Sequence, residues 1–158
     1  MPDLSANMEF NLFLENDVVD WEKINENFEK LDKLVQCTES GTKSASYTGA
    51  SSGNASWYYK KFSDGSIEMY TKLELDNVKC SSGASSPYQS GTISVNFPFK
   101  LVSVNDVHMN MASSTVGWVS DITGKGIVDL VRFTVRSTAY ENSVVYKQIY
   151  INVKGRWK

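Results

Sequence analysis

The sequence has few of the residues that build metal centres, disulfide frameworks or membrane spans. Its 158 residues include two cysteines, Cys37 and Cys80, and one histidine, His108, which excludes a Cys/His zinc cluster within one chain and argues against a disulfide framework. No run approaches the roughly 18 apolar residues of a transmembrane helix, and the first residues lack the basic and apolar regions of a secretory signal peptide. We therefore expect neither membrane insertion nor secretion.

The chain also carries little net charge. Lysine and arginine number 16 against 18 aspartates and glutamates, which leaves a net charge of −2 at pH 7. Such a chain has no long-range positive field to attract nucleic acid or an anionic membrane, so no nucleic-acid partner is expected. The hydrophobic fraction of 41% and the charged fraction of 22% are typical of a folded globular protein.

Most catalytic motifs are missing as well. The sequence has no Gly-x-Ser-x-Gly elbow, no phosphate-binding glycine loop and no His-Glu-x-x-His motif, so only paired carboxylates remain as a route to glycan hydrolysis. The acids considered for such a pair are Asp64, Glu68, Asp121 and Asp129. Eighteen acidic residues supply pairs in any soluble protein, and we therefore expect a protein that is not an enzyme and that holds no metal and no cofactor.

The composition changes along the chain and predicts three segments. Residues 1–37 are rich in Asp, Glu, Asn and long apolar side chains and are expected to form a helical stalk or attachment segment. Residues 38–56 are dominated by Ser, Thr, Gly and Ala, and we predict a flexible or extended linker there, because such a segment buries too little apolar surface to offset its ordering entropy. Residues 57–158 contain short β-rich runs separated by turn residues, which is typical of an antiparallel β-sandwich or barrel.

One helix is predicted in the first segment, from Asp20 as its N-cap to about Gln36. Its large apolar residues follow a heptad spacing of 3, 4, 3 and 4, and they are Trp21, Ile24, Phe28, Leu31 and Val35. A helix of about 16 residues is marginal alone in water, and the predicted linker separates it from the β domain that could otherwise cover it. Packing on its own domain is the alternative interpretation, but we predict self-association of identical helices through this stripe, as a coiled-coil-like stalk.

The third segment is expected to form a knob of seven or eight short strands. Asp64-Gly65 between two β-prone runs predicts a hairpin. After it, apolar residues from Ile67 to Leu75 alternate with polar ones, so one face of this strand is expected to be buried and the other to be wet or at an interface. Further strands are predicted at 92–97, 102–104, 107–112, 117–122, 127–136 and 144–153, with a turn at Asn105-Asp106 and others between them.

Several motifs resemble those of one family. Residues 57–65, WYYKKFSDG, are similar to the aromatic and basic hairpin that opens the C-terminal knob of tail-fibre and receptor-binding proteins of tailed bacteriophages, prophages and phage-tail-like particles. Phe97-Pro98-Phe99 in the middle of the knob and the ending KGRWK at 154–158 resemble the same group. Residues 25–32 are similar to an N-x-N-x-x-x-x-D segment found near the start of many phage tail proteins. The chain departs from full fibres in having almost no shaft.

The resemblance implies a homotrimer in the virion tail. Its N-terminal segment would meet a baseplate or tail protein, and its C-terminal β knob would touch a bacterial surface polysaccharide or wall polymer. The function expected is that of a non-enzymatic tail fibre or receptor-binding tip. Two alternatives remain, a structural baseplate or tail component without receptor binding and a bacterial lectin-like carbohydrate-binding module.

Alternating hairpins place three loops at one end of the predicted knob, together with the C-terminus: 63–66, 100–105 and 124–126. We expect this end to be distal from the stalk. The ligand-binding candidates there are Asp64, Lys100, Asn105 and Lys125, because short polar side chains on turns suit the hydroxyl and anionic groups of a glycan. The alternative interpretation is that they are ordinary solvated turn residues.

A few other side chains are further candidates for ligand contacts. Trp118 and Trp157 could stack on sugars, although an aromatic residue on a strand is more often in the core or at a subunit contact. Tyr88 and Tyr140 lie in predicted loops, at the end expected to be proximal. His108 could hold a metal on a trimer axis, but a single histidine is more often an ordinary hydrogen-bonded residue.

Overall fold

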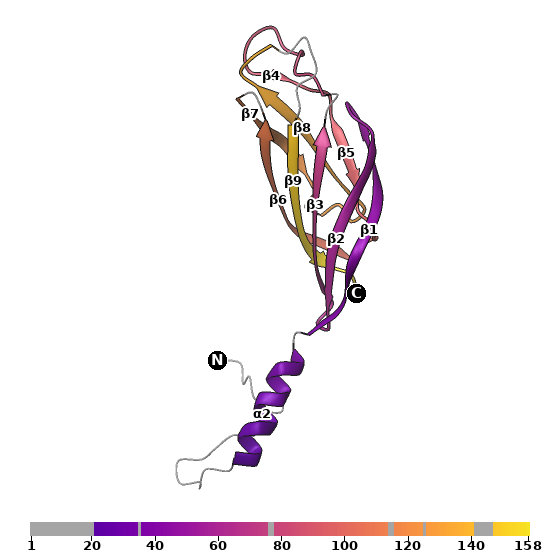
Figure 1. Ribbon diagram of the computed structural model, residues 1–158, viewed down its shortest axis with the longest axis vertical. Coiled ribbons are helices and arrows are strands. Elements are labelled where there is room, and N and C mark those ends of the chain that lie inside the picture. Colours follow the sequence, from indigo (N-terminus) through magenta and orange to yellow (C-terminus); the bar gives the residue numbers. More distant parts are fainter. Residues whose placement is uncertain (1–20, 35, 76–77, 114–115, 125, 141–146) are drawn as a thin grey trace.

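In the computed structural model the described residues form one helix and a curled antiparallel β-sheet (Figure 1). The structure describes residues 21–34, 36–75, 78–113, 116–124, 126–140 and 147–158. The helix is α2, Trp21–Leu34, and the strands are β1 Cys37–Gly49, β2 Gly53–Phe62, β3 Ser66–Leu75, β4 Tyr88–Gln89, β5 Ile93–Asn96, β6 Ser103–Ser113, β7 Gly117–Thr123, β8 Leu130–Ser137 and β9 Lys147–Arg156. The predicted mostly β, antiparallel character is confirmed. Asp20, Val35 and Lys125 lie outside the described residues.

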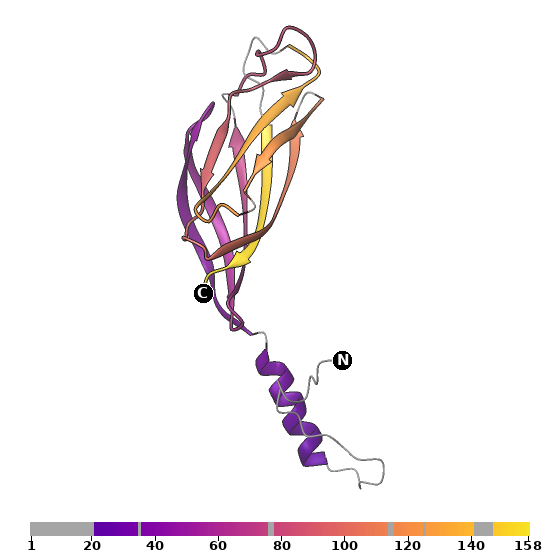
Figure 2. The same ribbon diagram turned by 180° about the vertical axis from the view of Figure 1, so that it is seen from behind.

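The nine strands formed by the described residues belong to one sheet. Its order is β4-β8-β5-β1-β2-β3-β9-β6, and β7 pairs with β8. The sheet curls until the consecutive strands β6 and β7 lie beside each other (Figures 1 and 2). The sequence predicts the two sheets of a sandwich, whereas the observed sheet is continuous because β1 pairs with β2 on one side and with β5 on the other.

The linker predicted at 38–56 is wrong, because this segment forms β1 and the first residues of β2. β1 pairs with β2 from Cys37↔Phe62 to Tyr47↔Gly53, and its last residues pair with β5 at Tyr47↔Val95. Backbone hydrogen bonds to two neighbouring strands hold a segment that has few apolar side chains. Ala45 and Tyr47 are half-buried and pack against the core, which adds apolar burial at two of its positions.

The core lies inside the curl and is built from alternating positions of the strands. The strand predicted from Ile67 to Leu75 is confirmed as β3, in which every second side chain from Ile67 onward is buried. β9 has the same alternation. Trp57 of β2 is completely buried and makes an edge-to-face contact with Phe97, with ring centroids 5.7 Å apart. Of the two cysteines, Cys80 is buried in this core and Cys37 is exposed.

The helix α2 projects away from the sheet, as both views show (Figures 1 and 2). It begins within one residue of the predicted start and ends two residues before the predicted end. The connection to the sheet is held at Gln36, whose carbonyl accepts a hydrogen bond of 2.9 Å from the Ser63 amide and whose amide donates one of 3.1 Å to Ser63 Oγ. We call the end of the sheet beside this connection the helix end and the opposite end the far end.

Two further predictions of local structure change. The turn predicted at Asn105-Asp106 is an irregularity within β6, because the register against β9 shifts between Val104 and Asp106 and the strand then continues. The short strand β4 lies in a segment that was expected to be a loop, and it pairs with the end of β8 through Tyr88↔Ser137.

None of the described helical residues forms a segment long and apolar enough to cross a membrane.

Candidate functional site

The predicted ligand residues that the structure describes, Asp64, Lys100 and Asn105, lie at the helix end, not at the distal end. Asp64 is in the β2–β3 turn beside the helix connection, and Asn105 lies in β6 next to the residues that pair with Gly155 and Arg156. Lys100 is exposed one residue before Leu101, and the neighbouring Val102 amide donates to the Arg156 carbonyl at 2.8 Å. The loops and the C-terminal residues therefore do share one end, as predicted. That end is next to α2 because β1, the strand missed in the sequence, reverses the direction of every later strand.

Local contacts already occupy two of these side chains. Asp64 Oδ1 accepts hydrogen bonds from the Ser66 hydroxyl at 2.7 Å and from the Ser66 amide at 2.8 Å. These bonds, with the nearby Arg156 charge as a smaller contribution, lower the pKa of Asp64 below its ordinary value. Asn105 Oδ1 accepts from Ser103 Oγ at 3.2 Å. Both side chains thus have roles in shaping their own turn or bulge.

The other candidate side chains are dispersed over the molecule. Tyr88 and Tyr140 pack edge to face, with centroids 5.1 Å apart, and they lie at the far end instead of the expected proximal end. Trp118 is exposed on β7 and Trp157 is half-buried beside Lys61, whose ammonium lies 5.1 Å from the Trp157 ring centroid. His108 is exposed and pairs with Asp106 at 2.8 Å. No group of three or more metal-binding side chains occurs within the described part of the chain.

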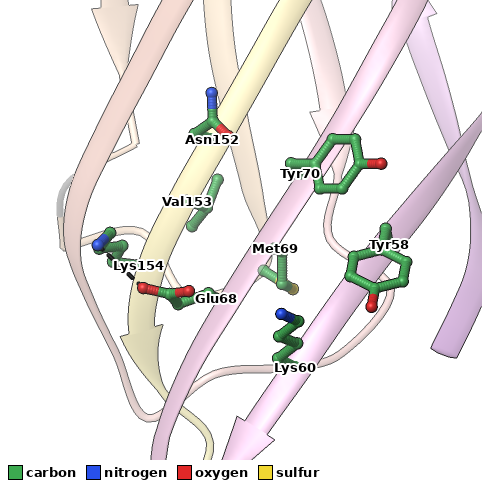
Figure 3. A pocket seen from close by; sticks show the side chains of 8 residues that line it. All are labelled: Tyr58, Lys60, Glu68, Met69, Tyr70, Asn152, Val153 and Lys154. Carbon is green, nitrogen blue, oxygen red and sulfur yellow. Dashed lines mark ion pairs between the residues drawn. The ribbon is translucent and has the colours of Figure 1, made fainter. Parts of the chain in front are cut away.

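A different surface brings polar and aromatic side chains together, on the outward face of β2, β3 and β9. The cross-strand partners Tyr58, Tyr70 and Asn152 form one row across these strands. Lys60, Glu68 and Lys154 form the adjacent row. Figure 3 shows the aromatic row above and the charged row below. This placement follows from the alternation of the strands, because every second residue points away from the core.

These six residues, together with Met69 and Val153, line a depression of ≈ 250 Å³, which we call the outer-face groove. Tyr58 and Tyr70 form its aromatic side, with ring centroids 5.4 Å apart and ring planes tilted by 46°. Tyr70 is 52% exposed, so its ring is accessible from solvent. The groove therefore combines an apolar wall with polar groups, as ligand sites do.

The charged row is only partly neutralised. Lys154 Nζ and Glu68 Oε1 form an ion pair of 2.9 Å, and this hydrogen-bonded carboxylate raises the pKa of Lys154 above its ordinary value. Asp106 on β6 is the next residue across from Lys154 and adds a smaller attraction. Within the described part of the chain, Lys60 Nζ forms neither an ion pair nor a hydrogen bond. The groove can therefore accept an anion at Lys60.

The groove combines aromatic, polar and charged side chains that suit ligand binding. Glu68 is the only carboxylate among its eight lining residues, and it is engaged by Lys154. Hydrolysis of a glycoside by paired carboxylates needs a second acid across the scissile bond. The arrangement can instead stack on an apolar ring, hydrogen-bond hydroxyl groups and attract negative charge.

The sequence alone does not predict the groove, although part of its signal is present there. The alternation in β3 predicts that Glu68 and Tyr70 lie on the wet face, and the structure confirms this. It does not reveal that Tyr58 and Asn152 lie beside Tyr70, because this depends on the pairing of three strands. Comparisons of the chain with protein-family models, with curated proteins and with solved structures find no match.

Proposed function

We propose that the protein is a non-enzymatic attachment protein, the homotrimeric tail fibre or receptor-binding tip of a bacteriophage tail or tail-like particle. In this proposal three helices form a coiled-coil-like stalk that joins a baseplate or tail protein through the N-terminal segment. Three sandwich-like β heads point away from it and contact a bacterial surface polysaccharide. The motif resemblance at 57–65, 97–99 and 154–158 supports the family, and the projecting helix supports the architecture.

The observation that carries the proposal is that α2 extends from the head without being covered by it. Ile24 is half-buried, and Phe28 is 61% exposed. Fully burying an apolar side chain of this size contributes about 1.5–3 kcal/mol, so a neighbouring copy of the helix would gain stability by covering the stripe. The stripe residues Trp21 and Leu31 are also in α2, but their side chains lie outside the described part of the structure.

Three copies would also make a weak binding site effective. Tethering several heads raises the effective concentration of the second and third contacts, so avidity can exceed single-site affinity by about 10²-fold or more. A shallow groove on each head would then suffice for attachment to a repetitive surface polymer. An open sheet face can provide such a shallow site, and a deep catalytic cleft is not needed for it.

The mass in solution tests the architecture. Light scattering of the full chain should give about three times 17.7 kDa, and the double variant Ile24→Asp, Phe28→Asp should give a single 17.7 kDa chain. Asn25→Asp, at an exposed position of the same helix, is the matched control and should keep the trimer. A wild-type monomer would contradict the proposal and favour a lectin-like module. An unchanged mass of the double variant would show that the heads alone hold the copies together.

Binding to cells tests the attachment role. Fluorescently labelled protein should stain intact bacteria of a suitable host saturably, and unlabelled protein should compete with it. A trimer that stains none of a broad panel of bacteria would contradict receptor binding and favour the structural baseplate or tail role.

A further inference from the structure

We infer that the outer-face groove binds a sugar ring that carries an anionic group, such as a uronic acid or a sugar phosphate in a surface polymer. The inference rests on the proposed function, because it identifies the surface through which each head would contact its glycan. It replaces the turn at the helix end as the expected contact, since that turn lies beside the stalk. Three properties of the groove lead to this ligand class.

The first property is the pair of tyrosine rings. Tyr58 and Tyr70 lie on adjacent strands and form a continuous aromatic surface, with centroids 5.4 Å apart. One face of a pyranose ring presents C–H groups, and a tyrosine offers an apolar ring with a polar hydroxyl at its tip. The exposure of Tyr70 leaves this surface accessible. A sugar ring laid on the tyrosines would bury apolar area on both partners.

The second property is a set of polar groups without partners. The hydroxyls of Tyr58 and Tyr70 and the side-chain amide of Asn152 make no hydrogen bond with any described residue. Asn152 pairs directly with Tyr70 across the strands, so its amide borders the aromatic surface. Hydroxyl and amide groups both donate and accept hydrogen bonds. Sugar hydroxyls do the same, so the two sets are complementary.

The third property is the charge. Two lysines and one glutamate line the groove, and Lys154 is attracted by Glu68 and by Asp106 on β6. Lys60 is the lining cation that forms no ion pair with a described residue. Hydrogen bonds between an ammonium and an anionic oxygen are shorter and about twice as strong as neutral ones. A neutral sugar would not form such a bond with the exposed Lys60, which is why we assign an anionic ligand. The volume of the groove, ≈ 250 Å³, is also smaller than the roughly 300–1,000 Å³ of sites for drug-sized ligands. The groove therefore suits a single sugar ring.

Binding of the full-length protein to an array of bacterial polysaccharides tests the inference. The array should carry uronic-acid and sugar-phosphate repeats beside neutral repeats of the same sugars. We expect retention on the anionic polymers and a loss of affinity of about tenfold or more for Tyr70→Ala, because the stacking surface is halved. Lys60→Gln should weaken binding by about threefold to tenfold and reduce its dependence on salt, because the unpaired ammonium is removed. Tyr150→Ala is the matched control, because Tyr150 is an exposed tyrosine on β9 that does not line the groove.

Each other outcome is decisive. The inference is overturned if the Tyr70→Ala and Tyr150→Ala variants bind the anionic polymers equally well. It is also overturned if the wild type binds neutral and anionic polymers equally well. A trimer that stains cells but binds no polymer on the array, or whose staining is unaffected by Tyr70→Ala, also overturns it and leaves the proposed function standing. If Tyr70→Ala lowers the mass in solution, the face is a contact between copies and not a ligand site. A monomer that binds anionic polymers through Tyr70 supports the inference and contradicts the trimeric attachment protein.

Discussion

Trp57 donates a hydrogen bond of 3.0 Å from its indole Nε1 to the backbone carbonyl of Asn96, and it thereby links β2 to β5. β1 separates these two strands in the sheet, so the bond crosses the inside of the curl. The Trp57 ring also meets Phe97 edge to face, and the Trp57 side chain is completely buried. The Trp57 side chain therefore both fills space in the core and donates the hydrogen bond that the Asn96 carbonyl at the end of β5 accepts.

Replacement of Trp57 by phenylalanine should lower the free energy of unfolding by about 1–3 kcal/mol, because the Asn96 carbonyl loses its donor and a cavity remains. Chemical denaturation followed by circular dichroism would measure it. Trp118→Phe on the exposed edge strand β7 is the control and should change stability by no more than about 0.5 kcal/mol. Equal losses for the two variants would contradict the role given to Trp57.

The end of β1 provides a test of the strand that replaces the predicted linker. Gly49 has a φ of 113°, and a Cβ added there would lie 2.1 Å from the Thr92 carbonyl oxygen. Gly49→Ala should therefore destabilise the fold by more than the roughly 1–2 kcal/mol expected from a left-handed backbone alone. Gly126→Ala is the matched control, because Gly126 has a φ of 81° and open space around its Cβ position. A Gly49 variant no less stable than the Gly126 variant would argue that 38–56 is a linker after all.

A polar cluster on β7 and β8 predicts a dependence on pH. Asp121 has a φ of 54°, and its carboxylate accepts hydrogen bonds from Thr134, Ser120 and Arg136 at 2.6, 3.0 and 3.2 Å. These bonds, led by that from Thr134, lower the pKa of Asp121 below its ordinary value of 3.8. A carboxylate with a lowered folded pKa stabilises the protein above its unfolded pKa, and the contribution is lost as the pH falls through the folded pKa.

Asp121→Asn removes this charge and keeps a residue that tolerates the left-handed region. We expect the variant to be less stable than the wild type at neutral pH and the difference to shrink below about pH 4. Thermal unfolding between pH 2.5 and 7 would measure both. Asp129→Asn, at an exposed position outside the cluster, should show no such convergence. A difference that stayed constant down to the lowest pH would indicate that the Asp121 charge contributes nothing.

Local patterns predict the elements whose signals are periodic. The spacing of Ile24 and Phe28 predicts α2, and the alternation from Ile67 to Leu75 predicts β3. Each pattern repeats with the period of its secondary structure, so the apolar residues fall on one face of the helix or strand. β1 has no such period, since its side chains are small and mostly exposed. Its stability comes from pairing with residues of β2 and β5, which composition does not encode.

The position of the ligand candidates depended on this one strand. Each antiparallel strand reverses the chain, so the omission of β1 moved Asp64, Lys100 and Asn105 from the helix end to the distal end in the prediction. Prediction of the groove would also need the pairing of strands that are far apart in the sequence, because Tyr70 lies beside Asn152 only when β9 pairs with β3. The polar character of Glu68 and Tyr70 was predictable, but their neighbours across the sheet were not.

The place of β9 in the sheet has a consequence for synthesis of the chain. β9 follows all the other strands in the sequence, yet it lies between β3 and β6 and pairs with both along their lengths. Contacts between residues so distant in sequence form late, because loop closure must precede them. A nascent chain whose β9 is still inside the ribosome therefore exposes two long unpaired strand edges, and there mispairing with another nascent copy would begin.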